Sequence, residues 1–230
     1  YWEVAATFAT STGARYVGMW HEGSTTRLTA GPPADAIVEA VAGKPAVVES
    51  LEIKPQTEQS PQLYDLTTLQ REANRRFGFS ASRTLSAAQA LYDQHKVLTY
   101  PRTNSRYLST DMIPQLKSVA GKVGAASPVY KDGARYVMEL DKLPLGKVIN
   151  DAKVTDHHAI IPTDGDHDLG ALNRDESRIY DLVARRFLAV FHPPARFENT
   201  VVETRCEGHL FRSRGKVLIE AGWRAVYGEE

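Results

Sequence analysis

The sequence predicts an α+β protein of two domains, in which a helical domain is inserted into a β-rich one. Strand-like sequence, rich in β-branched and aromatic residues, occupies both ends of the chain. Helical periodicity dominates the middle. The length of 230 residues is enough for two modest hydrophobic cores. We therefore expect a discontinuous β-rich domain of residues 1–61 and 195–230, and an inserted helical domain of residues 62–194.

The amino-terminal part of the β-rich domain begins with two expected strands, residues 1–10 and 14–20, separated by small turn residues. A short helix is expected within residues 31–44, because Pro33 suits a first helical turn and Gly43 follows the end. Further strands are expected at residues 45–56, 199–208 and 209–223.

The middle of the chain starts with two expected helices, residues 66–78 and 80–96, followed directly by an expected strand at residues 97–100. This order is typical of a helix-turn-helix or winged-helix unit, although it also occurs in helical domains that bind no DNA. Another amphipathic helix is expected from about residue 175 to the Pro193–Pro194 pair that ends it.

Composition excludes several classes of protein. No apolar run approaches the roughly 18 residues of a membrane span, so no membrane partner is expected. Cys206 is the only cysteine, which excludes disulfides and cysteine-rich zinc sites within this chain and favours a reducing, cytoplasmic setting. Basic and acidic residues balance at 28 each, so the net charge indicates no polyanionic partner.

The charge is unevenly distributed. Residues 63–109 contain seven basic against three acidic side chains, an excess of four. The basic residues are Arg71, Arg75, Arg76, Arg83, Lys96, Arg102 and Arg106. Such a local excess is expected of a phosphate-binding surface, and scattered solvated charges are the alternative.

Tyr100 and Arg102 stand two apart where the expected strand ends. A tyrosine has a pKa of about 10 and must lose its proton to act as a nucleophile. The guanidinium of Arg102 could hold two oxygens of the phosphate under attack, and an extended backbone would place both side chains on one face. The alternative is a structural tyrosine covered by an arginine.

Two adjacent histidines, His157 and His158, precede an apolar run within residues 153–163. A histidine can donate a hydrogen bond to phosphate or transfer a proton near neutral pH. Metal ligation is a further possibility, but no third ligand is evident. A role as loop caps also stays open.

The sequences LTYPRTNSRYLS (residues 98–109) and DHHAIIPT (residues 156–163), in this order, resemble the active-site region of type IA DNA topoisomerases, in particular the bacterial topoisomerase III branch. The helix pair upstream and GWRAVYG (residues 222–228) resemble the same family. The resemblance implies a winged-helix-like domain that carries the tyrosine, seated on a curved β arch. It also implies hinges near residues 56–62 and 193–196.

The resemblance assigns roles to individual residues. Tyr100 would attack single-stranded DNA and become linked to the 5′ phosphate, Arg102 would stabilise the transition state, and His157 would contact the scissile region. Candidates for DNA contact are Gln70, Gln89, Thr103, Ser105, Arg106 and His158. Cleavage and religation through this intermediate would change DNA topology without ATP.

The resemblance also implies partners. The family's acidic magnesium-binding domain has no match here, so we expect Mg²⁺ to bind to another part of the polypeptide and no metal to bind to this chain. Alone, the chain should be unable to relax DNA. The implied location is the bacterial cytoplasm, in association with the nucleoid.

Other interpretations were weighed. A non-catalytic winged-helix DNA-binding module would have no use for the Tyr100 and His157 motifs. In a tyrosine recombinase the tyrosine follows the histidine motif, whereas here it precedes it. Three alternating aspartates at residues 164–168 imitate a calcium loop, but Leu169 replaces the required glycine, so a solvated acidic loop is expected.

Overall fold

The computed structural model describes residues 1–228, and their contacts divide the chain into two compact units. The β-rich unit comprises Tyr1–Thr57 and Arg196–Glu220, and the helical unit comprises Glu58–Ala195 and the segment from Ala221 onward. The chain therefore passes from one unit to the other three times, and each unit has its own core.

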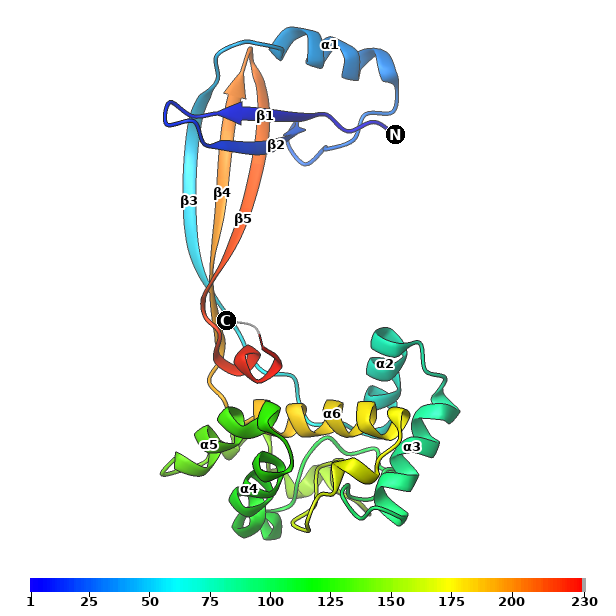
Figure 1. Ribbon diagram of the computed structural model, residues 1–230. Coiled ribbons are helices and arrows are strands. Elements are labelled where there is room, and N and C mark those ends of the chain that lie inside the picture. Colours follow the sequence, from blue (N-terminus) through cyan, green and yellow to red (C-terminus); the bar gives the residue numbers. More distant parts are fainter. Residues whose placement is uncertain (229–230) are drawn as a thin grey trace. The chain divides into compact units, whose positions relative to one another are not determined.

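The β-rich unit is built on a five-stranded sheet (Figure 1). Its strands are β1 (Ala5–Ala9), β2 (Arg15–His21), β3 (Val47–Glu58), β4 (Ala195–Cys206) and β5 (His209–Glu220). Their order is β1-β2-β5-β4-β3, with antiparallel pairing of β1 with β2, β2 with β5 and β4 with β5. Trp20 lies opposite Phe211, so the amino-terminal hairpin is joined to β5 through two core residues.

Helix α1 (Gly31–Val41) covers one face of this sheet. Its first turn contains proline, as the sequence predicts, and it buries Ala34 and Ile37 against Trp20 and Phe211. The alternating burial along β2 follows from strand geometry, since only every second side chain faces the helix.

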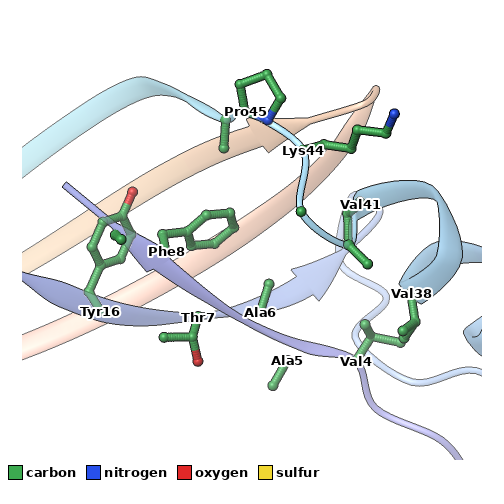
Figure 2. Close-up of a pocket in the computed structure, with 14 residues that line it drawn as sticks. Val4, Ala5, Ala6, Thr7, Phe8, Tyr16, Val38, Val41, Lys44 and Pro45 are labelled. Carbon is green, nitrogen blue, oxygen red and sulfur yellow. The ribbon is translucent and has the colours of Figure 1, made fainter. Parts of the chain in front are cut away.

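A depression of about 500 Å³ lies between β1 and the end of α1 (Figure 2). Phe8 and Tyr16 of the first hairpin and Val38 and Val41 of the helix contribute to its lining. Of its lining residues only Tyr16 and Lys44 can ionise, and the Tyr16 hydroxyl is within 3.0 Å of Thr204 Oγ1. No aspartate, glutamate, histidine or cysteine among residues 1–228 lines this depression.

The helical unit is arranged around α6, which has α2 and α3 on one side and α4 and α5 on the other (Figure 1). The helices are α2 (Leu66–Phe77), α3 (Ala81–Asp93), α4 (Leu116–Ala126), α5 (Lys131–Glu139) and α6 (Arg174–Ala189). None of the helices among residues 1–228 combines the length and the apolarity that a membrane crossing needs.

Local signals fix the bounds of α2 and α3. The Asp65 side chain accepts a hydrogen bond from Thr68 N, and the Asp65 backbone N–H donates to Thr68 Oγ1, which together form a capping box. Gly78, in the left-handed conformation, ends α2, and Ser80 caps α3. The turn between the two helices is therefore encoded locally.

Helices α4 and α5 were not predicted from the sequence. Helix α4 contains Gly121 and Gly124, which weaken helical propensity. A Cβ on Gly124 would lie 2.5 Å from the Cβ of Ala134 on α5, so the glycine permits the close approach of the two helices. The formation of α4 therefore depends on its packing against α5, and helix propensity along the sequence carries no information about that contact.

The prediction of a strand at residues 97–100 is wrong, because the structure has no strand there. The segment makes one isolated bridge, between Leu98 and Pro162, and the Ile161 N–H donates to Thr99 Oγ1 instead of to a main-chain carbonyl. Because a side chain replaces the backbone acceptor, the ladder stops after one bridge. Within the described part of the helical unit, β pairing beyond the ends of β3 and β4 consists of such isolated bridges, so the winged-helix description stays a prediction.

The expected domain boundary at the carboxyl end is also different. The segment Gly222–Tyr227 packs with the helical unit instead of the β-rich one. Trp223 Nε1 donates to Glu58 O at 2.9 Å, and Arg185 Nη1 donates to Val226 O at 2.6 Å. Residues 58–61, which precede α2, belong to the helical unit for the same reason.

Candidate active site

Tyr100 lies seven residues beyond the end of α3, after a turn in which Lys96 has a φ of 58°. Its half-buried ring is held between two others. Tyr92 of α3 meets it edge-on, with ring centroids 5.3 Å apart, and His157 packs at 4.4 Å. Within residues 1–228 the Tyr100 hydroxyl makes no hydrogen bond, so its oxygen is available to a substrate.

The chain after Tyr100 alternates strictly between buried and exposed side chains. Pro101, Thr103 and Ser105 are buried, whereas Arg102, Asn104 and Arg106 are exposed. This is the period of an extended backbone. The candidate residues of this segment therefore divide into two sets. Arg102 and Arg106 face outward, whereas Thr103 and Ser105 face inward, where both hydroxyls are hydrogen-bonded to main chain.

Two grooves meet at His157. One, of about 160 Å³, is lined by Tyr100, Ser109, Val154, Asp156 and both histidines. The other, of about 410 Å³, is lined by Arg102 together with Asp65, Thr155 and Asp156, among others. The structure thus brings Tyr100 and His157 into contact and places Arg102 in the second groove, which His157 also lines.

The remaining candidates for DNA contact lie in different places. Arg106 is exposed, with its Nε 3.9 Å from an Asp65 carboxylate oxygen. Half-buried His158 uses Nδ1 to donate to Ala159 O at 2.8 Å. Gln70 donates to Ala81 O at the start of α3, and Gln89 donates to Asp93 on its own helix. The two glutamines are therefore in local contacts that support the helix pair.

Much of the local excess of positive charge is paired. Arg75 and Arg76 both bind Glu72, and Arg83 binds Asp175. The other basic residues of this stretch, apart from Arg106, are Arg71, Lys96 and Arg102, and none has an ion pair within residues 1–228. These side chains could contribute to phosphate binding.

The aspartates of the imitation calcium loop do not converge. Asp164 accepts from Ser118 Oγ, Asp166 pairs with Lys122, and Asp168 accepts from Gly170 N. No group of three histidine, cysteine or acidic side chains within the described residues is placed to hold a metal ion. The donors present here therefore do not fit a magnesium site.

Sequence reasoning missed two residues of this site, and a third tyrosine that lies on the same segment as Tyr100. Tyr92 was assigned only to the apolar face of a helix, and Asp156, which lines both grooves, was not considered. Tyr107 accepts hydrogen bonds from Gln62 at 2.7 Å and Lys153 at 3.4 Å, and these lower the pKa of its phenol below the ordinary value. Adjacency to His157 in sequence was the available signal for Asp156.

A tyrosine with an open hydroxyl, a histidine in contact with its ring and an arginine in the next groove define a site suited to nucleophilic transfer of a phosphoryl group. The family model for DNA topoisomerase matches residues 1–230. The chain belongs to the DNA topoisomerase family, on its type IA, topoisomerase III-like branch.

Relatives named DNA topoisomerase 3 support this placement. The protein from Bacillus licheniformis is 47% identical over 188 residues, which cover 82% of this chain and 26% of the relative. The protein from Bacillus subtilis is 45% identical over 194 residues, which cover 83% of this chain and 26% of the relative. The chain thus spans about a quarter of the length of these relatives.

The fold is also that of a solved structure. Full-length topoisomerase I from Thermotoga maritima superposes with a TM-score of 0.66 at 23% identity. The match covers 100% of this chain and 36% of that one. The expected mixture of helices and strands is therefore confirmed at the level of the fold.

Proposed function

We propose that this chain carries the nucleophile of a type IA DNA topoisomerase. The observation that supports the proposal is the packing of Tyr100 against His157, with ring centroids 4.4 Å apart, next to the groove that contains Arg102. A DNA-binding module without chemistry would not need an uncommitted phenol beside a histidine and an arginine. Membership of the family makes a DNA phosphodiester the natural substrate of the cluster.

In the proposed reaction the Tyr100 oxygen attacks a phosphorus atom of single-stranded DNA. The new bond joins the phenolic oxygen to the 5′ phosphate, and the bond from phosphorus to the 3′ oxygen breaks. The phenol loses one proton and the departing 3′ oxygen gains one, so religation is the simple reverse and no ATP is consumed. Arg102 would stabilise the extra negative charge on the phosphate in the transition state, and His157 would contact the scissile region.

We propose that the remaining chemistry comes from the rest of the polypeptide, since the chain spans only 26% of its relatives. The acidic magnesium-binding domain expected of the family would supply the metal ion and the proton-transferring groups. The chain by itself should then bind single-stranded DNA weakly and fail to cleave it.

The helix pair α2 and α3 supports DNA binding in this proposal. The short turn between the helices is held by the Gln70 contact, and α3 carries Tyr92 against the nucleophile. We propose that the pair acts as the helix-turn-helix part of a winged-helix-like domain. Arg71, Lys96 and Arg102 would then attract the strand, and binding should weaken with salt.

Covalent trapping tests the function. Single-stranded DNA labelled at its 3′ end is incubated with the full-length protein and Mg²⁺, with this chain alone, and with the Tyr100→Phe variant of the full-length protein. A denaturant-resistant labelled adduct is expected with the full-length protein only. The label reports the 5′ linkage, because the 3′ part of the cleaved strand stays on the tyrosine.

Two neighbouring tyrosines provide matched controls. Tyr92→Phe keeps the edge-on ring, and Tyr107→Phe removes a phenol whose pKa lies below its ordinary value. Neither hydroxyl forms the proposed bond to phosphorus, so both variants should retain the adduct. An adduct that survives Tyr100→Phe and is lost in Tyr107→Phe would assign the nucleophile to Tyr107. Salt-sensitive DNA binding by the full-length protein without any adduct would favour the non-catalytic binding module.

A further inference from the structure

Three hydroxyl side chains around Tyr100 bind the main chain of the segment that carries His157. Thr103 Oγ1 donates to the carbonyl of His157 itself at 2.9 Å. Ser105 Oγ donates to Lys153 O at 2.7 Å, and Thr99 Oγ1 donates to Ala159 O at 3.3 Å. The three hydroxyls donate to main-chain carbonyls, as backbone N–H groups do in a β ladder. Thr99 lies before the proposed nucleophile in the chain, and Thr103 and Ser105 lie after it.

The same hydroxyls also accept hydrogen bonds. Thr103 Oγ1 accepts from Ser105 N, and Ser105 Oγ accepts from Tyr107 N, both at 3.1 Å. The side chains are 7% and 3% exposed. Each hydroxyl has a single O–H to donate, which is already used, and both residues are buried, so neither can donate to a DNA phosphate.

His157 depends on this support. Its exposed imidazole makes no hydrogen bond within residues 1–228, and its only ring contact there is with Tyr100. The position of the imidazole is therefore set by its own main chain, and the His157 carbonyl is held by Thr103. Loss of that bond would leave the His157 carbonyl without its side-chain donor and free the segment to shift.

We infer that Thr103 is a positioning residue, which fixes His157 against Tyr100 through the His157 carbonyl, and that Ser105 supports it through Lys153. This replaces the expectation that both residues contact DNA. The effect on cleavage rests on the proposed function, whereas the anchoring of His157 does not.

The anchoring is tested without DNA by hydrogen exchange and mass spectrometry on the full-length protein that contains this chain. Thr103→Val keeps the shape of the side chain and removes the hydroxyl. Amides of residues 157–161 should exchange roughly tenfold faster, the effect of losing one hydrogen bond of usual strength. Thr103→Ser keeps the hydroxyl and should behave as the original protein.

Thr84 provides the matched control. It is fully buried, and its Oγ1 donates to Ser80 O at 3.1 Å within the same unit, on α3. Thr84→Val therefore loses the same kind of bond without touching the His157 segment. Exchange in residues 157–161 should be unchanged in this variant.

Single-turnover cleavage of single-stranded DNA forms the second arm. Thr103→Val should slow the cleavage step by roughly tenfold or more while the affinity for DNA stays the same. Thr103→Ser should restore the rate, and Thr84→Val should leave it unaffected. This separation of rate from affinity distinguishes a positioning residue from a DNA contact.

Two results would overturn the inference. One is unchanged exchange in Thr103→Val, whether or not DNA binding is weakened. The other is an equal effect of Thr103→Val and Thr84→Val on cleavage. If the original full-length protein does not cleave DNA, the proposed function fails. The exchange comparison would still decide whether Thr103 anchors His157.

Discussion

The ring of Tyr100 is restrained while its oxygen is left open. Tyr92 and His157 contact the ring from two directions, and both contacts are through ring faces or edges that do not use the hydroxyl. Aromatic pairs of this kind contribute about 0.5–1.5 kcal/mol each, enough to favour one rotamer without covering the Tyr100 oxygen, the proposed nucleophile. A nucleophile that must meet a phosphorus atom in line gains from such restraint.

Gly222 is the residue at which the backbone itself is most constrained. Its φ is 52°, and an added Cβ would lie 2.4 Å from Pro194 O and 2.5 Å from Pro193 O. The Gly222→Ala variant would combine left-handed strain with a clash against rigid backbone. We expect it to lower the free energy of unfolding of the helical unit by more than about 2 kcal/mol.

The control for this prediction is Gly78→Ala. Gly78 has a φ of 68° in the same unit, but nothing lies within 4 Å of an added Cβ. The Gly78→Ala variant should lose only the free energy of unfolding that corresponds to left-handed strain, about 1 kcal/mol. Urea unfolding of both variants measures the difference in their free energies of unfolding. Equal losses would show that the backbone of Pro193 and Pro194 moves to make room for the added Cβ.

At the scale of elements, two histidines outside α6 form hydrogen bonds to it, His167 before its start and His192 after its end. His167 Nε2 donates to Thr163 O, while its Nδ1 accepts from the Tyr180 hydroxyl on α6 at 2.6 Å. His192 follows the helix, and its Nδ1 donates to Leu188 O at 2.9 Å. Burial lowers the pKa of both imidazoles below the ordinary value, so both are neutral when the unit is folded at neutral pH.

This arrangement predicts a pH dependence of stability. Each imidazole has a lower pKa in the folded than in the unfolded state, so the unfolded chain takes up protons first as the pH falls. The contribution to stability is complete above the unfolded value of 6.5 and is lost as the pH falls below it. Urea unfolding at about pH 7.5 and about pH 5.5 should show a less stable helical unit at the lower pH.

The His167→Gln, His192→Asn double variant tests the cause. Both replacements keep a hydrogen-bonding amide and remove the titrating group. The loss of stability between the two pH values should shrink in this variant. An unchanged loss would assign the effect to other groups.

The crossing of α4 and α5 gives a second prediction at this scale. Gly124→Ala would place a Cβ 2.5 Å from the Ala134 Cβ and force the helices apart. Gly121→Ala, one turn earlier on the same helix, would meet only the flexible Met138 side chain, at 3.1 Å.

Alanine in place of glycine normally gains up to about 1 kcal/mol of helix propensity. We therefore expect Gly121→Ala to be neutral or stabilising and Gly124→Ala to destabilise by about 1–3 kcal/mol. Thermal unfolding distinguishes the two variants. A stabilising Gly124→Ala would mean that the helices separate at little cost.

At the scale of the whole molecule, the chain crosses between the units after Thr57, Ala195 and Glu220. The first crossing adjoins the polar residues 56–62, whereas Ala195 is fully buried and follows two prolines. The hinges implied by the resemblance coincide with the first two crossings. Whether they move stays a prediction.

Limited proteolysis tests the first crossing. A protease of broad specificity should cut within residues 56–62 before it cuts any of the helices α2 to α6, because most of those helices are packed on the core of their unit. Mass spectrometry of the early fragments identifies the site. Early cuts within the helices, at the same sites that are cut in the denatured chain, would contradict the prediction that residues 56–62 are cut first.

The sequence by itself determined the elements whose signals are local. The first hairpin, α1, α2, α3 and α6 follow from alternation, helical period and caps such as Asp65. These signals lie within a few residues of each other, so no tertiary contact is needed to read them. Tyr100, Arg102 and His157 were identified differently, from two motifs more than 50 residues apart that resemble a known family, and their roles stay predictions.

The tertiary structure alone decided the rest. Helix α4 depends on a glycine that lets α5 approach, and the carboxyl-terminal segment joins the helical unit through Trp223 and Val226. Thr103 and Ser105 were expected to face DNA, yet they face carbonyls more than 45 residues away along the chain. A hydroxyl is equally suited to either partner, and only the fold determines which one it meets.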